Sequence, residues 1–334
     1  MKMRAAFGRG GAGIDTVEIR EVDRPVPGPG EALVRLKAAT LNFRDLLFIK
    51  GVLTHMTREP EYVPLSCGAG EVVEVGEGVA RVKAGDRVNP LFAQGWLSGP
   101  QTTPHMLGGL VDGVAREFAA FPADSLCLIP DALGDLEAAT LPCAGLTAWS
   151  ALFGARPLQA GEWILVQGTG GVSMAALQWA KAAGAGVIVT SSSDAKLARA
   201  RALGADIVIN YRRTPDWAGA ARAARGGAGV DIVLDVVGES QVEALAGVLN
   251  EGGVIAAIGM LESPFSWTRQ EIGGHKVVPI GVGNRDQHEA MLAFAARHAI
   301  RPVVDVVYDL DRLQDAMLHL QGQQFFAKVG VNLL

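Results

Sequence analysis

The chain has 334 residues, of which 49% are apolar and 19% are charged, and its formal net charge at pH 7 is −5. This length allows two ordinary domains, each with a full apolar core. Because no window of Lys and Arg is interleaved with aromatic residues, we expect no nucleic-acid partner. No apolar run approaches the roughly 18 residues of a membrane helix, so we expect no membrane partner either.

Three cysteines, at positions 67, 127 and 143, are too few for a disulfide framework and indicate a reducing compartment. The first seven residues resemble a short strand and are too brief for the apolar core of a signal peptide. We therefore expect a cytoplasmic protein.

The first part of the chain is rich in predicted strands. Residues 31–39 alternate between apolar and polar, and residues 71–76 and 79–88 are predicted to be strands joined by a Gly-Glu-Gly turn. Residues 42–51 between them predict a short helix that ends at a glycine. The loops 51–64 and 92–113 are long enough to form the walls of a site.

A glycine-rich turn after residue 162 predicts a dinucleotide-binding unit. The run 163–166 is continuously apolar, as in a parallel strand covered on both faces, and a helical pattern begins after the turn. Gly168 allows a tight turn, and Gly170 lets the backbone approach a pyrophosphate at the helix N-terminus. Ser173 stands where this fingerprint has a third small residue, and it is small enough for close helix packing.

Further strands alternate with helical patterns, as a doubly wound parallel sheet requires. They are predicted at 186–190, 206–210, 230–235, 253–258 and 276–282, which gives six strands in all between residues 162 and 283. After them come a helix at 286–298, a strand at 301–307, a helix at 310–321 and a strand at 328–331. We expect this tail to return to the first domain.

The end of the second of these strands favours a nucleotide with a 2′-phosphate. Chains that bind NAD place an acidic residue there, whereas this chain has Ser191, with Lys196 as a nearby cation. Tyr211 and Arg212 could close the pocket. In the alternative interpretation the serines form a polar loop in which Asp194 caps the next helix, and both interpretations can hold together.

The whole chain resembles the medium-chain dehydrogenase/reductase superfamily. The resemblance is carried by residues 41–47, 68–78, 82–88 and 138–149 and by the turn at Gly168. It implies an α/β fold in which a Rossmann NADP(H)-binding domain, residues 126–299, accompanies a GroES-like β-rich catalytic domain. That catalytic domain is residues 1–125, completed by 300–334, and the resemblance implies that the cofactor binds between the two.

Many relatives bind zinc through a Cys, a His followed by Glu, and a further Cys or Asp. In this chain Asn42 stands in place of the first Cys, Ser66 and Cys67 stand in place of the His-Glu pair, and only Cys143 matches a ligand position. We therefore predict no metal. Within the superfamily the chain therefore resembles the zinc-independent branch of quinone oxidoreductases and enone reductases, which implies NADPH as the cofactor.

The catalytic candidates are the polar residues at the former metal positions. Asn42 could donate its amide to the substrate oxygen or to the nicotinamide ribose, or it could only cap the helix at 43–50. Ser66 could donate likewise or only close a turn. Arg44 and Asp45 are expected to form a local ion pair, and Cys143 is expected to be a small buried apolar residue.

Two more candidates lie outside that position. By resemblance Thr147 lies near the nicotinamide, although it could be mere packing. Tyr62 and His55 are candidate proton donors in the loop, where polar side chains are usually solvated.

The cofactor candidates follow the glycine turn and the carboxyl ends of the strands. They are Gly168, Thr169, Gly170, Gly171 and Val172 for the pyrophosphate, Ser191, Ser192 and Lys196 for the 2′-phosphate, Tyr211 for the adenosine, and Gly259, Met260, Val282 and Gly283 for the nicotinamide. The sixth strand is apolar enough to pair edge to edge in a homodimer, as many relatives do.

The leading hypothesis is an NADPH-dependent, metal-free oxidoreductase that transfers hydride to a quinone or an α,β-unsaturated carbonyl compound. Aromatic residues in the first domain suggest an apolar or aromatic electrophile as the small-molecule substrate. One alternative is a zinc-independent alcohol or carbonyl oxidoreductase. Another is a non-catalytic, crystallin-like protein that binds NADPH.

Overall fold

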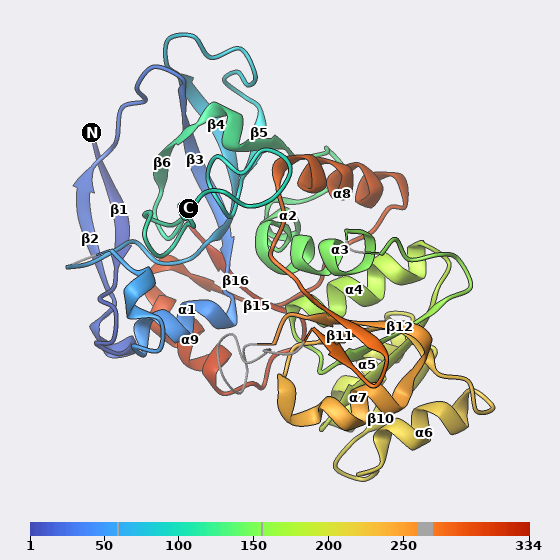
Figure 1. Cartoon of the computed structure of the whole chain (residues 1–334). Coiled ribbons are helices and arrows are strands. Elements are labelled where there is room, and N and C mark those ends of the chain that lie inside the picture. The colour runs from blue at the N-terminus through green and yellow to red at the C-terminus, as the bar shows by residue number, and fades with distance from the viewer. Residues whose placement is uncertain (59, 155, 260–269) are drawn as a thin grey trace. The chain divides into compact units, whose positions relative to one another are not determined.

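The chain forms two compact units in the computed structural model, which describes residues 1–334 except 59, 155 and 260–269 (Figure 1). Unit 1 combines residues 1–146 with 282–334, and unit 2 is residues 147–281. Within the described parts of the chain, no helix has the length and apolar character needed to cross a membrane.

Unit 1 is built on a mixed β-sheet with a separate two-stranded ribbon. Its elements are β1 (Lys2–Phe7), β2 (Glu18–Asp23), β3 (Glu31–Thr40), α1 (Phe43–Ile49), β4 (Cys67–Val75), β5 (Arg87–Pro90), β6 (Phe118–Pro122), β7 (Leu126–Leu128), α2 (Asp135–Ala139), α8 (Arg285–Arg297), β15 (Val304–Asp309), α9 (Leu313–Gln321) and β16 (Lys328–Asn332). The sheet order is β15-β16-β3-β4-β5-β7, β6 also pairs with β3, and β1 pairs with β2.

The long strand β3 organises this sheet, because β16, β4 and β6 all pair with it in antiparallel fashion. Its residues Val34 and Leu36 are fully buried, and burial of each such side chain contributes about 2 kcal/mol. The register brings chain segments nearly 300 residues apart into contact, since Gly330 of β16 lies opposite Thr40 of β3.

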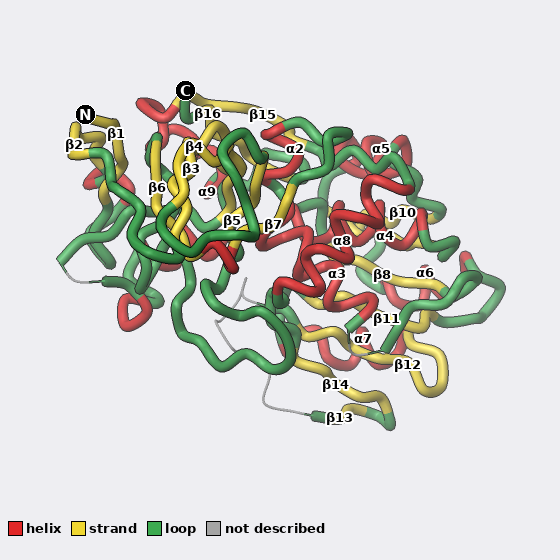
Figure 2. Tube along the Cα trace, turned by 90° about the horizontal axis from the view of Figure 1, so that it is seen from above, coloured by secondary structure: helices red, strands yellow, loops and turns green. Residues whose placement is uncertain are grey.

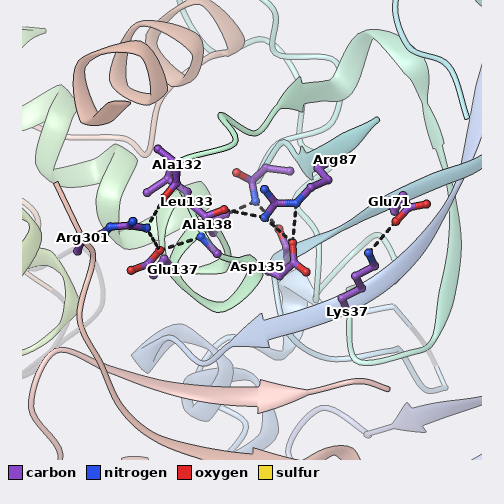
Figure 3. A network of polar contacts seen from close by, with 12 residues as sticks. Lys37, Glu71, Arg87, Ala132, Leu133, Asp135, Glu137, Ala138 and Arg301 are labelled. Atoms are coloured by element: carbon purple, nitrogen blue, oxygen red, sulfur yellow. Dashed lines mark hydrogen bonds and ion pairs between the residues drawn. The ribbon is translucent and has the colours of Figure 1, made fainter. Parts of the chain in front are cut away.

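The segment 126–146 belongs to unit 1, so unit 1 extends further along the chain than the predicted domain boundary after residue 125. Polar contacts attach this segment (Figure 3). Arg87 donates to Asp135 at 2.6 Å and to the carbonyl of Leu133 at 2.7 Å. Arg301 from the C-terminal part donates to Glu137 at 2.9 Å. Pairing of β7 with β5 adds backbone hydrogen bonds.

The expected strand at 79–88 is wrong for most of its length, because β5 covers only Arg87–Pro90. A turn occupies the residues before it. Gly85 has a φ of 91°, and the backbone N–H of Lys83 donates to the Asp86 carboxylate at 2.9 Å. A conformation with positive φ favours glycine and interrupts an extended strand.

Unit 2 is a doubly wound sheet, as predicted. Its elements are α3 (Leu146–Phe153), β8 (Trp163–Gln167), α4 (Gly171–Ala182), β9 (Gly186–Ser191), α5 (Asp194–Ala202), β10 (Ile207–Asn210), α6 (Trp217–Ala224), β11 (Val230–Asp235), α7 (Val242–Val248), β12 (Leu249–Ala257), β13 (Glu271–Ile272) and β14 (His275–Pro279). The order is β10-β9-β8-β11-β12-β14-β13, and Figure 2 shows β12, β14 and β13 following one another at one edge.

The six strands that the sequence predicts are parallel, and only the two-residue β13 is antiparallel. The strand order reverses direction between β8 and β11, the two neighbours in the middle of the sheet. Ligands of such sheets bind at the carboxyl ends of the strands beside this reversal. Here the glycine turn follows β8 directly.

A buried histidine in α8 makes unit 1 sensitive to acid. His288 is 0% exposed, and both ring nitrogens are without a hydrogen-bond partner among the described residues. Burial lowers the pKa of His288 from 6.5 to about 3. The unfolded chain therefore binds a proton below pH 6.5 that the folded chain does not, so stability falls as the pH falls through this range.

We predict that His288→Met reduces this acid sensitivity. Between pH 6.5 and 4.5 the wild type should lose roughly 2–3 kcal/mol through His288, and the variant should not. Urea unfolding at several pH values measures the difference. The exposed His298 next to the same helix provides the control, since His298→Gln should keep the wild-type pH profile. Parallel profiles for the wild type and His288→Met would contradict the prediction.

Candidate active site

A group of polar and thiol-bearing residues, all buried except the partly buried Cys143, gathers at the end of β3, and we call Asn42, Ser66, Cys67, Cys143 and Lys328 the polar cluster. Strand register builds it. Thr40 lies opposite Gly330 on one side and Cys67 on the other. Continued by two residues along both strands, the first of these registers brings Asn42 opposite Lys328.

Hydrogen bonds fix the orientation of the Asn42 amide. Lys328 donates from Nζ to Oδ1 of Asn42 at 2.6 Å and to the carbonyl of Leu41. The Nδ2 group of Asn42 donates to Ser66 Oγ at 3.3 Å and to Cys67 Sγ at 3.1 Å. Because an ammonium can only donate, the amide oxygen must face Lys328 and the NH2 group must face Ser66 and Cys67.

Asn42 is both the first residue of the helix cap and a member of the polar cluster. Its backbone N–H donates to the Asp45 carboxylate at 2.8 Å, which caps α1. The capping position expected of Asn42 is confirmed, and its role as a donor to the substrate oxygen or the nicotinamide ribose stays a prediction.

The expected Arg44–Asp45 ion pair is wrong, since no N–O contact within 4 Å joins these two described residues. The Asp45 carboxylate is directed back to the helix cap. Arg44 instead donates to the carbonyl of Leu107 at 2.9 Å and lies over the rings of Phe48 and Phe92, 4.2 and 4.8 Å from their centres. Burial lowers the pKa of Arg44, and Asp45 opposes that effect.

The thiols of Cys67 and Cys143 interact with each other. Cys143 lies in a π-helical segment, Leu141–Gly145, between α2 and α3, and such segments recur at functional sites. Burial disfavours ionisation of Cys67, yet the hydrogen bond from Cys143 and the charge of Lys328 bring its pKa below the usual range. The hydrogen bond to Cys67 and burial raise the pKa of Cys143. The pair therefore releases its first proton easily and its second with difficulty. Cys143 packs against apolar residues, as expected, but it is only partly buried and its thiol also interacts with Cys67.

A strained residue precedes Ser66. Leu65 is fully buried and has a φ of 68°, which is uncommon for a side chain of this kind. Close backbone packing holds it there, because a Cβ at Gly113 would lie 1.9 Å from the Leu65 carbonyl oxygen. The unusual conformation lies directly beside the polar cluster.

The other catalytic candidates lie apart from these hydrogen bonds. Tyr62 is 1% exposed, its hydroxyl is without a hydrogen-bond partner among the described residues, and burial raises its pKa. Tyr62 is therefore a core residue and not a solvated loop residue. His55 is exposed. Thr147 is buried in the first turn of α3 in unit 2.

The donor set does not fit a zinc ion. A zinc site needs at least three protein ligands, usually Cys, His, Asp or Glu. No group of three such residues that could hold a metal occurs in the part of the chain that the structure describes. The polar cluster offers two thiols, and its remaining members are an amide, a hydroxyl and an ammonium whose charge repels a metal cation.

The glycine turn of unit 2 has the geometry of a phosphate site. Gly168 has a φ of 70°, and a Cβ added at Gly170 would meet nothing within 4 Å. Ser173 donates from Oγ to the carbonyl of Gln167 at 2.7 Å, which ties α4 to the end of β8. Backbone N–H groups at the start of this 12-residue helix favour an anion, so residues 168–172 fit a cofactor pyrophosphate.

The residues expected at the 2′-phosphate meet at the ends of β9 and β10. The backbone N–H of Tyr211 donates to the Ser191 carbonyl at 3.1 Å, and Tyr211 is 42% exposed. The helix cap differs from the expectation. Ser193, and not Asp194, caps α5 by accepting from the backbone N–H of Lys196, while Asp194 accepts from Asn210 at 2.7 Å. Ser191, Ser192 and Lys196 thus stand around the start of α5.

The nicotinamide candidates are divided between the units. Gly259 follows β12 in unit 2, and Met260 lies outside the described residues. Val282 and Gly283 belong to unit 1. There Val282 packs against an apolar cluster that contains Phe92 and Trp96.

Two family patterns match the chain. The zinc-binding dehydrogenase pattern matches residues 171–297, and the alcohol dehydrogenase GroES-like domain matches residues 28–131. A zinc-type alcohol dehydrogenase-like protein of Schizosaccharomyces pombe is 40% identical over 335 residues and covers 96% of each chain. The chain belongs to the medium-chain dehydrogenase/reductase superfamily. It is an oxidoreductase of the alcohol dehydrogenase type.

Solved structures support the same fold and differ in their cofactor. An NAD-dependent alcohol dehydrogenase is 32% identical, with a TM-score of 0.89 and 99% of each chain covered. A mycobacterial protein solved with NADPH is 25% identical, with a TM-score of 0.80 and 99% of each chain covered. This chain accordingly belongs to a family of NAD(P)-dependent enzymes.

We predict that Gly170→Ala weakens cofactor binding without unfolding unit 2. The added methyl group would occupy the open space beside the helix N-terminus, where the pyrophosphate would approach. The dissociation constant of NADPH, measured by fluorescence titration, should rise by about tenfold or more, which is about 1.4 kcal/mol. Gly247→Ala in α7 is the matched control, since its Cβ also meets nothing within 4 Å. Equal affinities for the wild type and Gly170→Ala would show that the pyrophosphate binds elsewhere.

Proposed function

We propose that this protein reduces quinones or α,β-unsaturated carbonyl compounds with NADPH and without a metal. The observation that carries the proposal is the polar cluster. Where zinc-dependent relatives need a ligand set, this chain has the Asn42 amide donor hydrogen-bonded to the buried ammonium of Lys328.

The chemistry asks the protein to stabilise an oxygen anion. Bound NADPH supplies a hydride from its nicotinamide C4 to the electrophilic carbon of the substrate. As the carbon accepts the electron pair, the carbonyl oxygen gains negative charge and becomes an enolate, and a proton then completes the product. When the substrate oxygen replaces Ser66 Oγ or Cys67 Sγ as an acceptor, one Nδ2–H of Asn42 can donate to it, and Ser66 can donate its hydroxyl hydrogen. Loss of one donor of this kind costs about 10²–10³ in turnover.

The apolar surroundings favour an apolar or aromatic substrate. Phe92, Ala93 and Trp96 are buried, and Met106 and Cys143 pack against them. Cys143 belongs to the polar cluster, so these apolar side chains contact one of its members. Such a combination of apolar surface with few polar groups is typical of small-molecule sites.

Preference for NADPH is supported by the residues around Ser191. A carboxylate at this position would bond the ribose hydroxyls and repel a phosphate, whereas hydroxyl groups with Lys196 nearby accept one. The first turn of α5 adds backbone N–H groups that favour an anion. A homodimer formed by edge-to-edge pairing of the sixth predicted strand stays a prediction, and β13 already pairs with His275 and Lys276 on the outer side of that strand, β14.

A second candidate is a carbonyl or alcohol oxidoreductase, which the names of the relatives favour. Reduction of an isolated carbonyl develops alkoxide charge, which zinc stabilises as a Lewis acid in many enzymes. The two thiols and the ammonium of the polar cluster do not form a zinc site, so we rank this candidate second.

The decisive experiment follows NADPH oxidation by protein treated with a chelator. The acceptors are a small quinone, an aromatic ortho-quinone, an enone and a simple aldehyde, with NADH tested alongside. We expect turnover of a quinone or the enone, with NADPH preferred over NADH. Turnover of the aldehyde alone, or activity that returns only when zinc is added, would contradict the proposal.

A further inference from the structure

Lys328 is a buried cation that forms no ion pair with a carboxylate of the described residues. It is 4% exposed, and among the ion pairs of the described residues none involves Lys328. Within the described residues, its Nζ donates only to neutral oxygens, those of Leu41 and Asn42. An ammonium taken out of water without an opposite charge costs several kcal/mol, whereas an apolar side chain of similar size would fit between the buried residues of β16 at no such cost.

Other strand residues show that burial of a charge is not needed for the sheet. Val329 and Val331 of β16 are fully buried and apolar. Lys37 on the adjacent β3 is also partly buried, but it donates to the Glu71 carboxylate at 2.7 Å (Figure 3). Lys328 thus differs from Lys37 in lacking a carboxylate.

While both thiols are protonated, the charges around the polar cluster leave an excess of positive charge. Lys328 and Arg44 are cations, and Asp45 is the carboxylate that interacts with both. Cys67 already responds to this field, because the Lys328 charge helps to lower its pKa. The surroundings of Asn42 therefore favour a negative charge, and its NH2 group is directed away from Lys328.

We propose that Lys328 is a positioning residue that takes over the electrostatic work of the absent metal. It holds the oxygen of the Asn42 amide, so that the NH2 group faces the site, and it polarises this amide toward an oxygen that becomes negative during hydride transfer. The inference rests on the proposed function only in requiring a substrate oxygen that gains negative charge. Quinones, enones and aldehydes all meet that requirement.

The first test compares Lys328→Met with the matched control Lys37→Met, using the acceptor that the wild type reduces fastest, whichever class it belongs to. Lys328→Met should lower kcat about 100-fold, as loss of an oxyanion donor does, and leave the NADPH dissociation constant within about twofold. Lys37→Met should leave both unchanged. Lys328→Arg keeps the charge and should recover part of kcat.

A double-mutant cycle tests whether Lys328 acts through Asn42. If it does, adding Asn42→Ala to Lys328→Met should lower kcat no further than the more damaging single variant does. Multiplied effects of the two changes would overturn the proposal, because Lys328 would then act independently of the amide.

A readout without turnover keeps the inference separate from the proposed function. Hydrogen exchange of the Asn42 side-chain amide, followed by NMR, should be at least about tenfold faster in Lys328→Met than in the wild type and in Lys37→Met. Unchanged exchange together with unchanged kcat would overturn the role of Lys328. If the wild type reduces only the aldehyde, the proposed substrate class fails while the cycle still tests Lys328. If the wild type reduces no acceptor, the exchange rate of the Asn42 amide alone tests whether Lys328 holds this amide in place.

Discussion

The antiparallel pairing of β16 with β3 is the constraint on which unit 1 depends. It joins the last strand of the chain to the first long one, with Val331 opposite Ala39 and Gly330 opposite Thr40. The same register brings Lys328 to Asn42, while pairing of β3 with β4 brings Cys67 to Thr40. A shift by one residue would turn every side chain of β16 to the opposite face and would remove Lys328 from Asn42. The register of β16 on β3 therefore determines both the packing of the core and the assembly of the polar cluster.

This arrangement gives a physical account of how a member of a family with many zinc enzymes can work with other groups. A metal ion contributes positive charge and a fixed direction of attraction. In the site that we propose, Lys328 contributes the charge, and its hydrogen bond to Asn42 fixes the direction in which the amide donates. Because the ammonium is buried, its field is screened less by water than that of a surface lysine. Such a site suits an oxygen whose negative charge develops during the reaction. An enolate oxygen needs less stabilisation from the protein than an alkoxide does.

The sequence predicted unit 2 well, because its signals are local. The glycine turn, the apolar strand before it and the alternation of strands and helices lie within short windows, and the six-strand sheet follows from them. The sequence indicated only some members of the polar cluster. Asn42, Ser66 and Cys143 stand out because they occupy positions where relatives carry metal ligands. Lys328 is the first residue of the last predicted strand, where a lysine is usually exposed to solvent. Its partner is 286 residues away, and only the register of β16 reveals the contact. The cap of α5 was missed by one residue, because Ser193 and Asp194 are both good capping residues.

We propose that hydride goes to a carbon conjugated with a carbonyl group, in a site that uses no metal. This proposal is tested most directly by reducing cyclohexenone with NADPH doubly deuterated at nicotinamide C4, using chelator-treated protein whose metal content has been measured. The account predicts cyclohexanone with deuterium on the β-carbon and less than a stoichiometric amount of zinc. Deuterium on the carbonyl carbon of an allylic alcohol, or a requirement for stoichiometric zinc, would contradict it.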